Sequence, residues 1–208
     1  MKSKRRLREE TEGEEYLHKA AWEVVKRQIA HAEANPKGSL YDDLVAMVFA
    51  FHCIEGYLNF VGEKVAPDLW ANERLTFKHT GLTGKLATIC QRCGIGTPDN
   101  GRRPFATVVE LRKLRDRMAH PKIQKVRKTV EFMEGKLPPL FPKSYLATLI
   151  SHTNAIRARD DVKLIADEIH AAAVAEFPHL ALGRDALEGM HSMHSSTTRL
   201  VQPFDKAG

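Results

Sequence analysis

The feature that most constrains the fold is a long apolar stripe in the second quarter of the chain. The stripe begins at Leu44 and stops before Pro67; its other members are Val48, Phe51, Ile54, Leu58, Val61 and Val65. Side chains three and four residues apart share one face of an α-helix. The stripe therefore predicts one helix of about 25 residues that follows Ser39, its N-cap.

The same spacing recurs along most of the chain. It predicts further helices near residues 13–34, 82–93, 105–119 and 144–156, and a last one with Asp160 as its N-cap. No strand pair is visible in the pattern. The sequence therefore predicts an all-α fold, an antiparallel up-and-down helical bundle with short connections.

The chain divides into four parts by composition and pattern. We expect an N-terminal helical extension over residues 1–38 and a helical core over 39–125. A C-terminal helical extension over 126–182 should pack on that core. Periodicity fades after it, which predicts a mobile tail over 183–208.

Positive charge is concentrated in one window. Residues 102–128 hold ten Lys and Arg side chains against Glu110 and Asp116, which exceeds the formal net charge of +6 for the whole chain. Such a field attracts a polyanion such as nucleic acid. The alternative is a solvated basic face that has no partner.

The chain shows no run of 18 apolar residues, and its first ten residues are charged without an apolar signal segment. We therefore expect a cytoplasmic protein with no membrane partner. Cys90 and Cys93 form a CxxC pair at apolar positions of a predicted helix, which favours buried thiols over a zinc or redox site. No metal and no cofactor is predicted.

The basic window contains an arginine and a histidine five residues apart near the end of a predicted helix. In the segment LRKLRDRMAHPK, Asp116 follows Arg115 directly, and His120 precedes Pro121. This pattern resembles the R-x4-6-H motif of the HEPN superfamily, in which a polar residue commonly follows the arginine. The resemblance covers about residues 40–125. It implies an all-helical bundle, often dimeric; many members are metal-independent endoribonucleases of toxin or anti-phage systems, whereas others have lost catalysis.

Two other pairs fit the same motif. Arg74 precedes His79 at the same spacing, and Arg184 with His191 fits the longer variant. Arg74 falls between predicted helices and Arg184 lies near the tail, whereas Arg115 lies on an amphipathic helix inside the basic window. The context therefore favours Arg115.

A second phosphate-binding pattern is incomplete. The segment GLTGK at residues 81–85 resembles the end of a phosphate-binding loop. However, His79 stands at the position of the first glycine, and Leu86 replaces the Ser or Thr that such a loop requires. We therefore expect no nucleotide loop here.

The chemistry expected of the motif depends on the helix ending at His120. On a continuous helix the Arg115 and His120 side chains would point about 140° apart, but Pro121 disfavours helical conformation at His120. An imidazole there suits removal of the proton from an RNA 2′-hydroxyl, and the Arg115 guanidinium would stabilise the charged phosphorane. Asp116 would orient His120 or an arginine of a second copy. The structural alternative is a pair of cations that close a helix C-terminus.

Partners follow from the same residues. Arg112, Lys113, Arg117 and Lys122 are the predicted RNA-binding residues. A single histidine does not readily serve as both base and acid, so we expect a homodimer that brings both copies of His120 to one cleft.

The sequence thus predicts a HEPN-like, metal-independent endoribonuclease of toxin or defence type. RNA is its expected substrate, and an antitoxin or another protein is a further expected partner. Two alternatives stay open: a catalytically inactive HEPN-like scaffold, and a module that binds nucleotide or nucleic acid without cleaving it.

Overall fold

The structure is a computed structural model that describes residues 7–123, the odd-numbered residues from 125 to 133, residues 145–189 and residues 191–200. Most of the described chain is helical, which confirms the predicted helical character in outline. The elements in chain order are β1 (Leu7–Glu15), α1 (Leu17–Ala34), α2 (Leu40–Val65), α3 (Pro67–Trp70), α4 (Glu73–Thr76), α5 (Gly81–Arg92), α6 (Phe105–Ala119), α7 (Tyr145–Leu149), α8 (His152–Glu176) and β2 (His191–Leu200).

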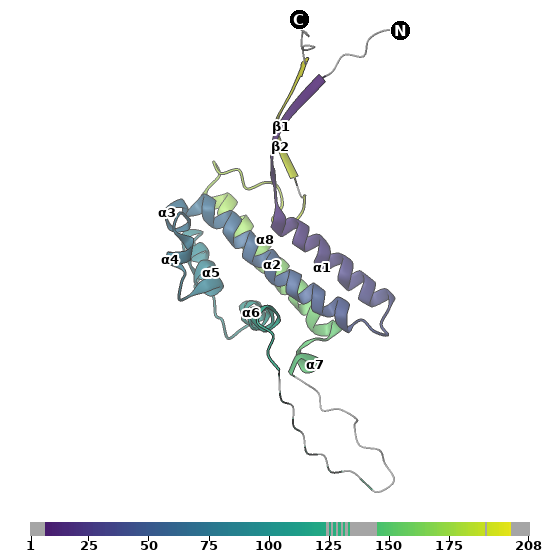
Figure 1. The fold of residues 1–208 in the computed structure, drawn as a ribbon. Helices are drawn as coiled ribbons and strands as arrows, with labels where there is room; N and C mark the ends of the chain where they lie inside the picture. Colours follow the sequence, from purple (N-terminus) through teal and green to yellow (C-terminus); the bar gives the residue numbers. More distant parts are fainter. Residues whose placement is uncertain are drawn as a thin grey trace, which may run out of the picture.

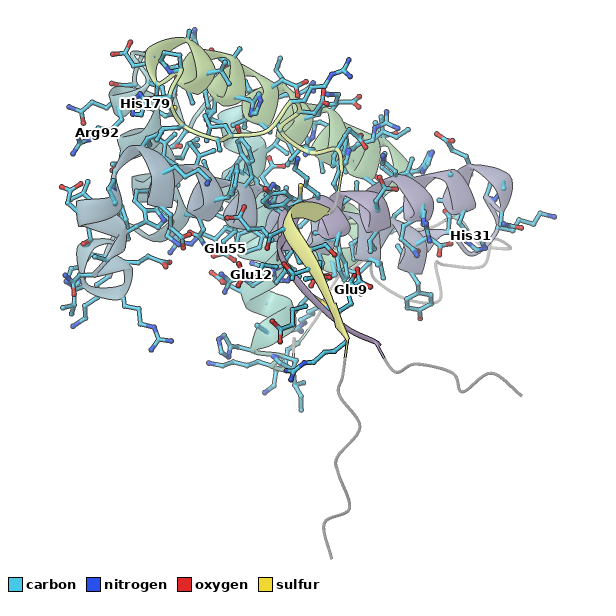
Figure 2. The ribbon with its side chains drawn as sticks, turned by 90° about the horizontal axis from the view of Figure 1, so that it is seen from above. Glu9, Glu12, His31, Glu55, Arg92 and His179 are labelled. Atoms are coloured by element: carbon cyan, nitrogen blue, oxygen red, sulfur yellow. The ribbon has the colours of Figure 1, made fainter. Side chains whose placement is uncertain are left out.

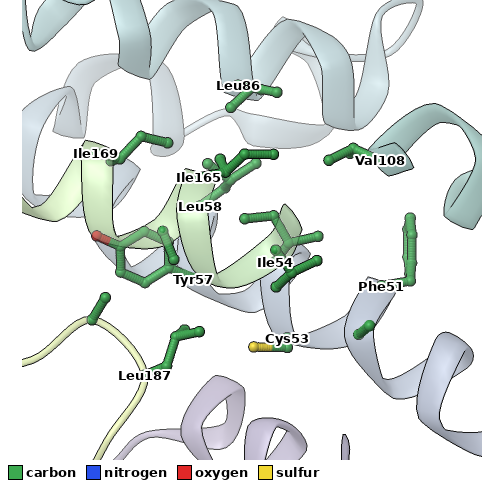
Figure 3. Close-up of a cluster of buried hydrophobic side chains, with 14 of the residues drawn as sticks. Phe51, Cys53, Ile54, Tyr57, Leu58, Leu86, Val108, Ile165, Ile169 and Leu187 are labelled. Carbon is green, nitrogen blue, oxygen red and sulfur yellow. The ribbon is translucent and has the colours of Figure 1, made fainter. Parts of the chain in front are cut away.

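Helix α2 is the central element of the structure. It contacts α1, α5, α6 and α8, so that other helices cover several of its sides (Figure 1). Phe51, Ile54, Tyr57 and Leu58 of α2 are fully buried, and Figure 3 shows them within the core cluster. The long apolar stripe of the sequence is therefore the centre of the hydrophobic core.

By length and composition, α2 is also the one helix in the described ranges that is apolar enough to cross a membrane. Its most apolar 18-residue window has a mean hydropathy of 1.6, and half of that window is buried within the protein. A core helix of a globular protein meets the same criterion. The contacts of α2 with α1, α5, α6 and α8 favour that explanation, and the cytoplasmic location stays a prediction.

The predicted N-caps differ from the observed ones. Ser39 does precede α2, but its hydroxyl donates a hydrogen bond to the Asp43 carboxylate at 3.3 Å and caps no backbone N–H. Asp160 as an N-cap is wrong, because it lies inside α8. The cap of α8 is Ser151, whose hydroxyl oxygen accepts from the backbone N–H of Asn154 at 3.2 Å. The helix predicted over 144–156 is accordingly split at this serine.

Buried Asp161 ties α8 to the start of α6. Its carboxylate is 4% exposed and accepts hydrogen bonds from Arg103 Nε at 2.9 Å, Arg103 Nη2 at 2.8 Å and Thr107 Oγ1 at 2.5 Å. A buried carboxylate requires such partners, because unpaired charge is costly away from water. The contact fixes the position of α6, the helix that carries the predicted motif.

The link between α2 and α5 forms two one-turn helices, α3 and α4, that the sequence analysis did not predict. Pro67 occupies the first position of α3, where the missing N–H is not needed. Trp70 packs so closely on Gly62 that a Cβ there would lie 2.1 Å from the indole ring. The link thereby holds α4, with Glu73 and Arg74, near α5.

The two ends of the described chain form an antiparallel strand pair. Strands β1 and β2 run from the pair Leu7 and Leu200 to the pair Glu15 and His191, with an irregularity between Glu12 and Gly13. The expectation of no strand pair is therefore wrong. The described side chains of both strands are exposed, Glu9 and Glu12 of β1 among them (Figure 2). Neither strand therefore has the apolar alternation that predicts a half-buried strand. The pair extends away from the helices beyond the start of α1 (Figure 1).

The segment before β2 also differs from the predicted mobile tail. Leu182, Ala186 and Leu187 are buried in the core, with exposed fractions of 2 to 3%. The Lys19 ammonium donates to the backbone carbonyls of Asp185 at 2.9 Å and Glu188 at 2.6 Å. Residues 182–188 are therefore held by burial of apolar side chains in the core and by hydrogen bonds from α1.

Candidate functional site

A surface pocket lies among α2, α4, α5 and α6. Its volume is about 210 Å³. Four cationic side chains and three carboxylates line it, together with the start of α5. The lining residues are Glu55 of α2, Glu73 and Arg74 of α4, Phe77 just after α4, Gly81, Leu82 and Lys85 of α5, and Arg112, Arg115 and Asp116 of α6.

The predicted motif arginine lies in this pocket because of how α6 packs. Leu111 and Leu114 of α6 are buried, which turns Arg115 toward α2. The Arg115 guanidinium carbon lies 4.6 Å from the centre of the Phe51 ring, a cation–π contact. Arg115 Nη2 lies 3.5 Å from a carboxylate oxygen of Glu55. These contacts from α2 hold the guanidinium in one place.

Arg112, one turn earlier on α6, approaches the first residue of α5. Its Nη1 donates to the backbone carbonyl of Thr80 at 3.3 Å. Gly81 has a positive φ of 57°, and a Cβ there would lie 3.4 Å from Arg112 Nη2. The glycine thus permits both the turn and the close approach of the guanidinium.

Asp116 lies between these two arginines. Its Oδ1 is 3.0 Å from Arg115 Nη1, and its Oδ2 is 3.9 Å from Arg112 Nε. The carboxylate is about half exposed. No contact supports the predicted role of Asp116 in orienting His120, because no side-chain hydrogen bond or ion pair joins these two residues in the described chain.

The other wall of the pocket contains a buried lysine. The Lys85 side chain is 7% exposed, and its ammonium donates to Asn59 Oδ1 at 2.8 Å and to a carboxylate oxygen of Glu73. Lys85 and Glu73 therefore neutralise one another. Arg74 is exposed and lies next to Glu73 on α4. It has no ion-pair partner among the residues that the structure describes.

His120 lies at the end of α6 and does not line the pocket. Its φ of −126° and ψ of 66° show that the chain leaves the helix at this residue, as Pro121 predicts. The backbone N–H of His120 still donates to the carbonyl of Asp116 at 3.1 Å. The imidazole is exposed, and the structure shows no hydrogen bond between it and Arg115.

The predicted RNA-binding residues occupy two neighbouring places. Arg112 lines the pocket, whereas Lys113 and Arg117 are exposed on α6 and Lys122 is exposed just after it. Arg103, also in the basic window, is bound to Asp161 and serves the fold. Residues 124, 126 and 128 lie outside the described residues.

The sequence analysis missed four charged residues of the pocket: Glu55, Glu73, Arg74 and Lys85. Two of them had weak signals, since Arg74 belongs to a competing motif match and Lys85 ends the segment GLTGK. These residues lie together because the tertiary structure places α4 and α5 beside α6, and no local sequence pattern predicts that placement.

The cysteines behave as predicted. Cys53, Cys90 and Cys93 are buried free thiols. Burial raises the pKa of Cys90 to about 12 and that of Cys93 to about 11, which keeps both thiols protonated at neutral pH. In the described part of the chain, no group of three or more His, Cys, Asp or Glu side chains is arranged to hold a metal ion.

Fold and site together define a mainly helical protein with a small surface pocket of net positive charge. No protein-family model, no curated protein and no solved structure matches the chain. The HEPN resemblance therefore stays a prediction that the residues of the α6 motif carry.

Proposed function

We propose that this protein binds RNA through the pocket and the adjoining face of α6. The observation that supports the proposal is the convergence of Arg74, Lys85, Arg112 and Arg115 from three helices on one opening. Lys113, Arg117 and Lys122 continue the positive surface beyond it. Guanidinium groups hydrogen-bond phosphate oxygens in a bidentate manner, which makes arginine well suited to such contacts.

Binding to RNA is tested by fluorescence anisotropy with a labelled single-stranded oligonucleotide. We expect Arg112→Ala and Arg74→Ala each to weaken the affinity about five-fold, which corresponds to ~1 kcal/mol per phosphate contact. The matched control is Arg184→Ala, since Arg184 is 97% exposed, lies outside the pocket and belongs to a competing motif match. Equal losses in all three variants would mean that only net charge matters and that the pocket is not the binding site.

We extend the proposal to metal-independent cleavage, the activity that the HEPN resemblance implies. The observation that favours it is the exposed His120 at the end of the helix that carries Arg115. His120 would take the proton of a 2′-hydroxyl, and Arg115 would stabilise the charge that develops on the attacked phosphate. A homodimer would supply a second imidazole as the acid.

Cleavage is tested with labelled RNA in EDTA, followed by analysis of the product ends. We expect products that end in 2′,3′-cyclic phosphate, and we expect His120→Ala to abolish them. His79→Ala is the control, because His79 is exposed and has the same spacing from its own arginine. Binding without cleavage in the wild-type protein would favour the inactive HEPN-like module instead.

A further inference from the structure

The Asp116 carboxylate occupies the position that an anionic ligand would take in the pocket. It is held by Arg115 Nη1 at 3.0 Å and lies 3.9 Å from Arg112 Nε. Two arginines that converge on one carboxylate form the arrangement that also binds phosphate oxygens. The internal carboxylate therefore marks an oxyanion position within the pocket.

Both guanidiniums have other contacts that would hold them if Asp116 moved away. Arg115 lies against the Phe51 ring and beside Glu55, and Arg112 donates to the carbonyl of Thr80. Asp116, by contrast, is 48% exposed, and within the described part of the chain its ion pairs are these two. The aspartate is thus the member of the cluster that can turn into solvent with the least disturbance.

The charges of the pocket favour a ligand with more than one negative charge. Glu73 neutralises Lys85, and Glu55 partly neutralises Arg115. Displacement of Asp116 would leave Arg112 without a carboxylate, beside Arg74, which has no ion-pair partner in the described ranges. A phosphate monoester carries about −1.5 to −2 charges at pH 7, whereas a phosphodiester carries one. A monoester is therefore the stronger competitor for the place of a carboxylate.

The size of the pocket points to the same ligand. Its volume of about 210 Å³ lies below the range of about 300–1,000 Å³ typical of sites that enclose a whole small molecule. A pocket of this size takes a terminal group of a larger ligand. The end of a nucleic-acid chain presents such a group, whereas an internal phosphodiester has chain on both sides.

We propose that the pocket binds a phosphate monoester, the terminal phosphate of an RNA chain or of a free nucleotide, which takes the place of the Asp116 carboxylate between Arg112 and Arg115. The inference rests on the proposed function only where it names RNA as a source of that phosphate.

The first experiment uses inorganic phosphate as the probe and the full-length protein, with binding measured by calorimetry. We expect Asp116→Asn to tighten phosphate binding at least three-fold, because the competing carboxylate is gone, and Arg112→Ala to weaken it by a similar factor. The matched control is Asp160→Asn, since Asp160 is also paired with the preceding arginine on a helix, at 2.8 Å, and the change in net charge is the same. Thermal melts of each variant confirm that it is folded. Weaker or unchanged binding in Asp116→Asn would overturn the inference.

The second experiment identifies the source of the phosphate. Binding is measured for three forms of one RNA octamer: one that carries a 5′-phosphate, one that carries a 3′-phosphate and one that has hydroxyl groups at both ends. A nucleoside monophosphate is measured alongside them. We expect one phosphorylated form to bind about ten-fold more tightly than the hydroxyl form, and Arg112→Ala to abolish the difference. Equal binding of all the octamers would overturn the inference while the proposed RNA binding survives. Binding of the nucleotide and phosphate without binding of any octamer would support the inference and contradict the proposed function.

Discussion

Asp161 shows at the scale of one residue how a charged side chain is accommodated inside the protein. It is 4% exposed, and three donor atoms from Arg103 and Thr107 satisfy its two oxygens. Its neighbour Asp160 is exposed and forms an ion pair with Arg159. Two adjacent aspartates therefore differ in role: Asp161 joins α8 to α6 inside the protein, whereas Asp160 lies on the surface. Only their positions on α8 distinguish them.

We expect Asp161→Asn to lower the free energy of unfolding by about 2 kcal/mol, because the amide loses the bidentate ion pair and leaves buried donors poorly satisfied. Urea denaturation measures the change. Asp160→Asn should alter the free energy of unfolding by less than about 0.5 kcal/mol. Equal effects of the two substitutions would contradict the structural role given to Asp161.

His18 provides a pH-dependent test at the same scale. Burial and the nearby Lys19 charge lower the pKa of His18 to about 4 from its ordinary value near 6.5. The unfolded chain therefore binds more protons than the folded one between these pH values, so stability falls as the pH falls from about 6.5 to 4. The contribution of His18 to this loss is roughly 3 kcal/mol.

The measurement is urea denaturation at several pH values from 7 to 4, for the wild-type protein and for His18→Gln. Glutamine does not titrate, so the variant should lose less stability over this range than the wild-type protein. A His18→Gln protein with the full wild-type slope would show that other groups cause the acid sensitivity.

At the scale of elements, periodicity predicted the helices that bury a continuous apolar face. Helix α2 matched its stripe, and α6 spans Phe105–Ala119 as expected. The break before α8 was missed, because it depends on one serine cap within a stretch that is apolar on both sides. The strands β1 and β2 were missed because their described side chains are exposed and their partners lie at opposite ends of the chain.

The sequence predicted the part of the candidate site that lies on α6 and not the part that other helices contribute. Arg112, Arg115 and Asp116 were identified because they share one amphipathic helix with a recognisable motif. Arg74 and Lys85 reach the pocket on other helices, α4 and α5. Their approach depends on tertiary packing, such as Trp70 against Gly62, that sequence spacing does not encode.

The attachment of residues 182–188 to α1 gives a test at this scale. The Lys19 ammonium is buried and donates to two backbone carbonyls of that segment. We expect Lys19→Met to speed amide hydrogen exchange in residues 182–188, with little change in α2. The control is Lys26→Met, which removes more exposed ion pairs with Glu23 and Glu188 but no hydrogen bond to a backbone carbonyl of the segment. Unchanged exchange in the Lys19→Met protein would mean that apolar packing alone holds the segment.

At the scale of the whole molecule, the proposed cleavage requires two copies of the chain. The end of α6 presents apolar side chains that a second copy would cover: Met118 is 41% exposed and Ile123 is 97% exposed. These residues flank His120 in the sequence. A contact between two copies at this end would bring the two imidazoles toward one another.

Sedimentation velocity tests this arrangement. We expect the wild-type protein to sediment as a dimer, and Ile123→Glu to shift it to a monomer with loss of cleavage, because a charge would be buried at the contact. Leu164→Glu is the control, since Leu164 is 55% exposed on α8 and distant in sequence from the motif. A monomeric wild-type protein that still cleaves RNA would contradict the two-copy mechanism.

The central claim is that pocket arginines contact RNA phosphates, and the salt dependence of affinity tests it most directly. For single-stranded RNA, the logarithm of the binding constant falls with the logarithm of salt concentration by about 0.7 per neutralised phosphate. Removal of both Arg74 and Arg112 should therefore make the slope shallower by about 1.4, whereas Arg184→Ala should leave it unchanged. A double variant with the wild-type slope would show that RNA does not contact the pocket.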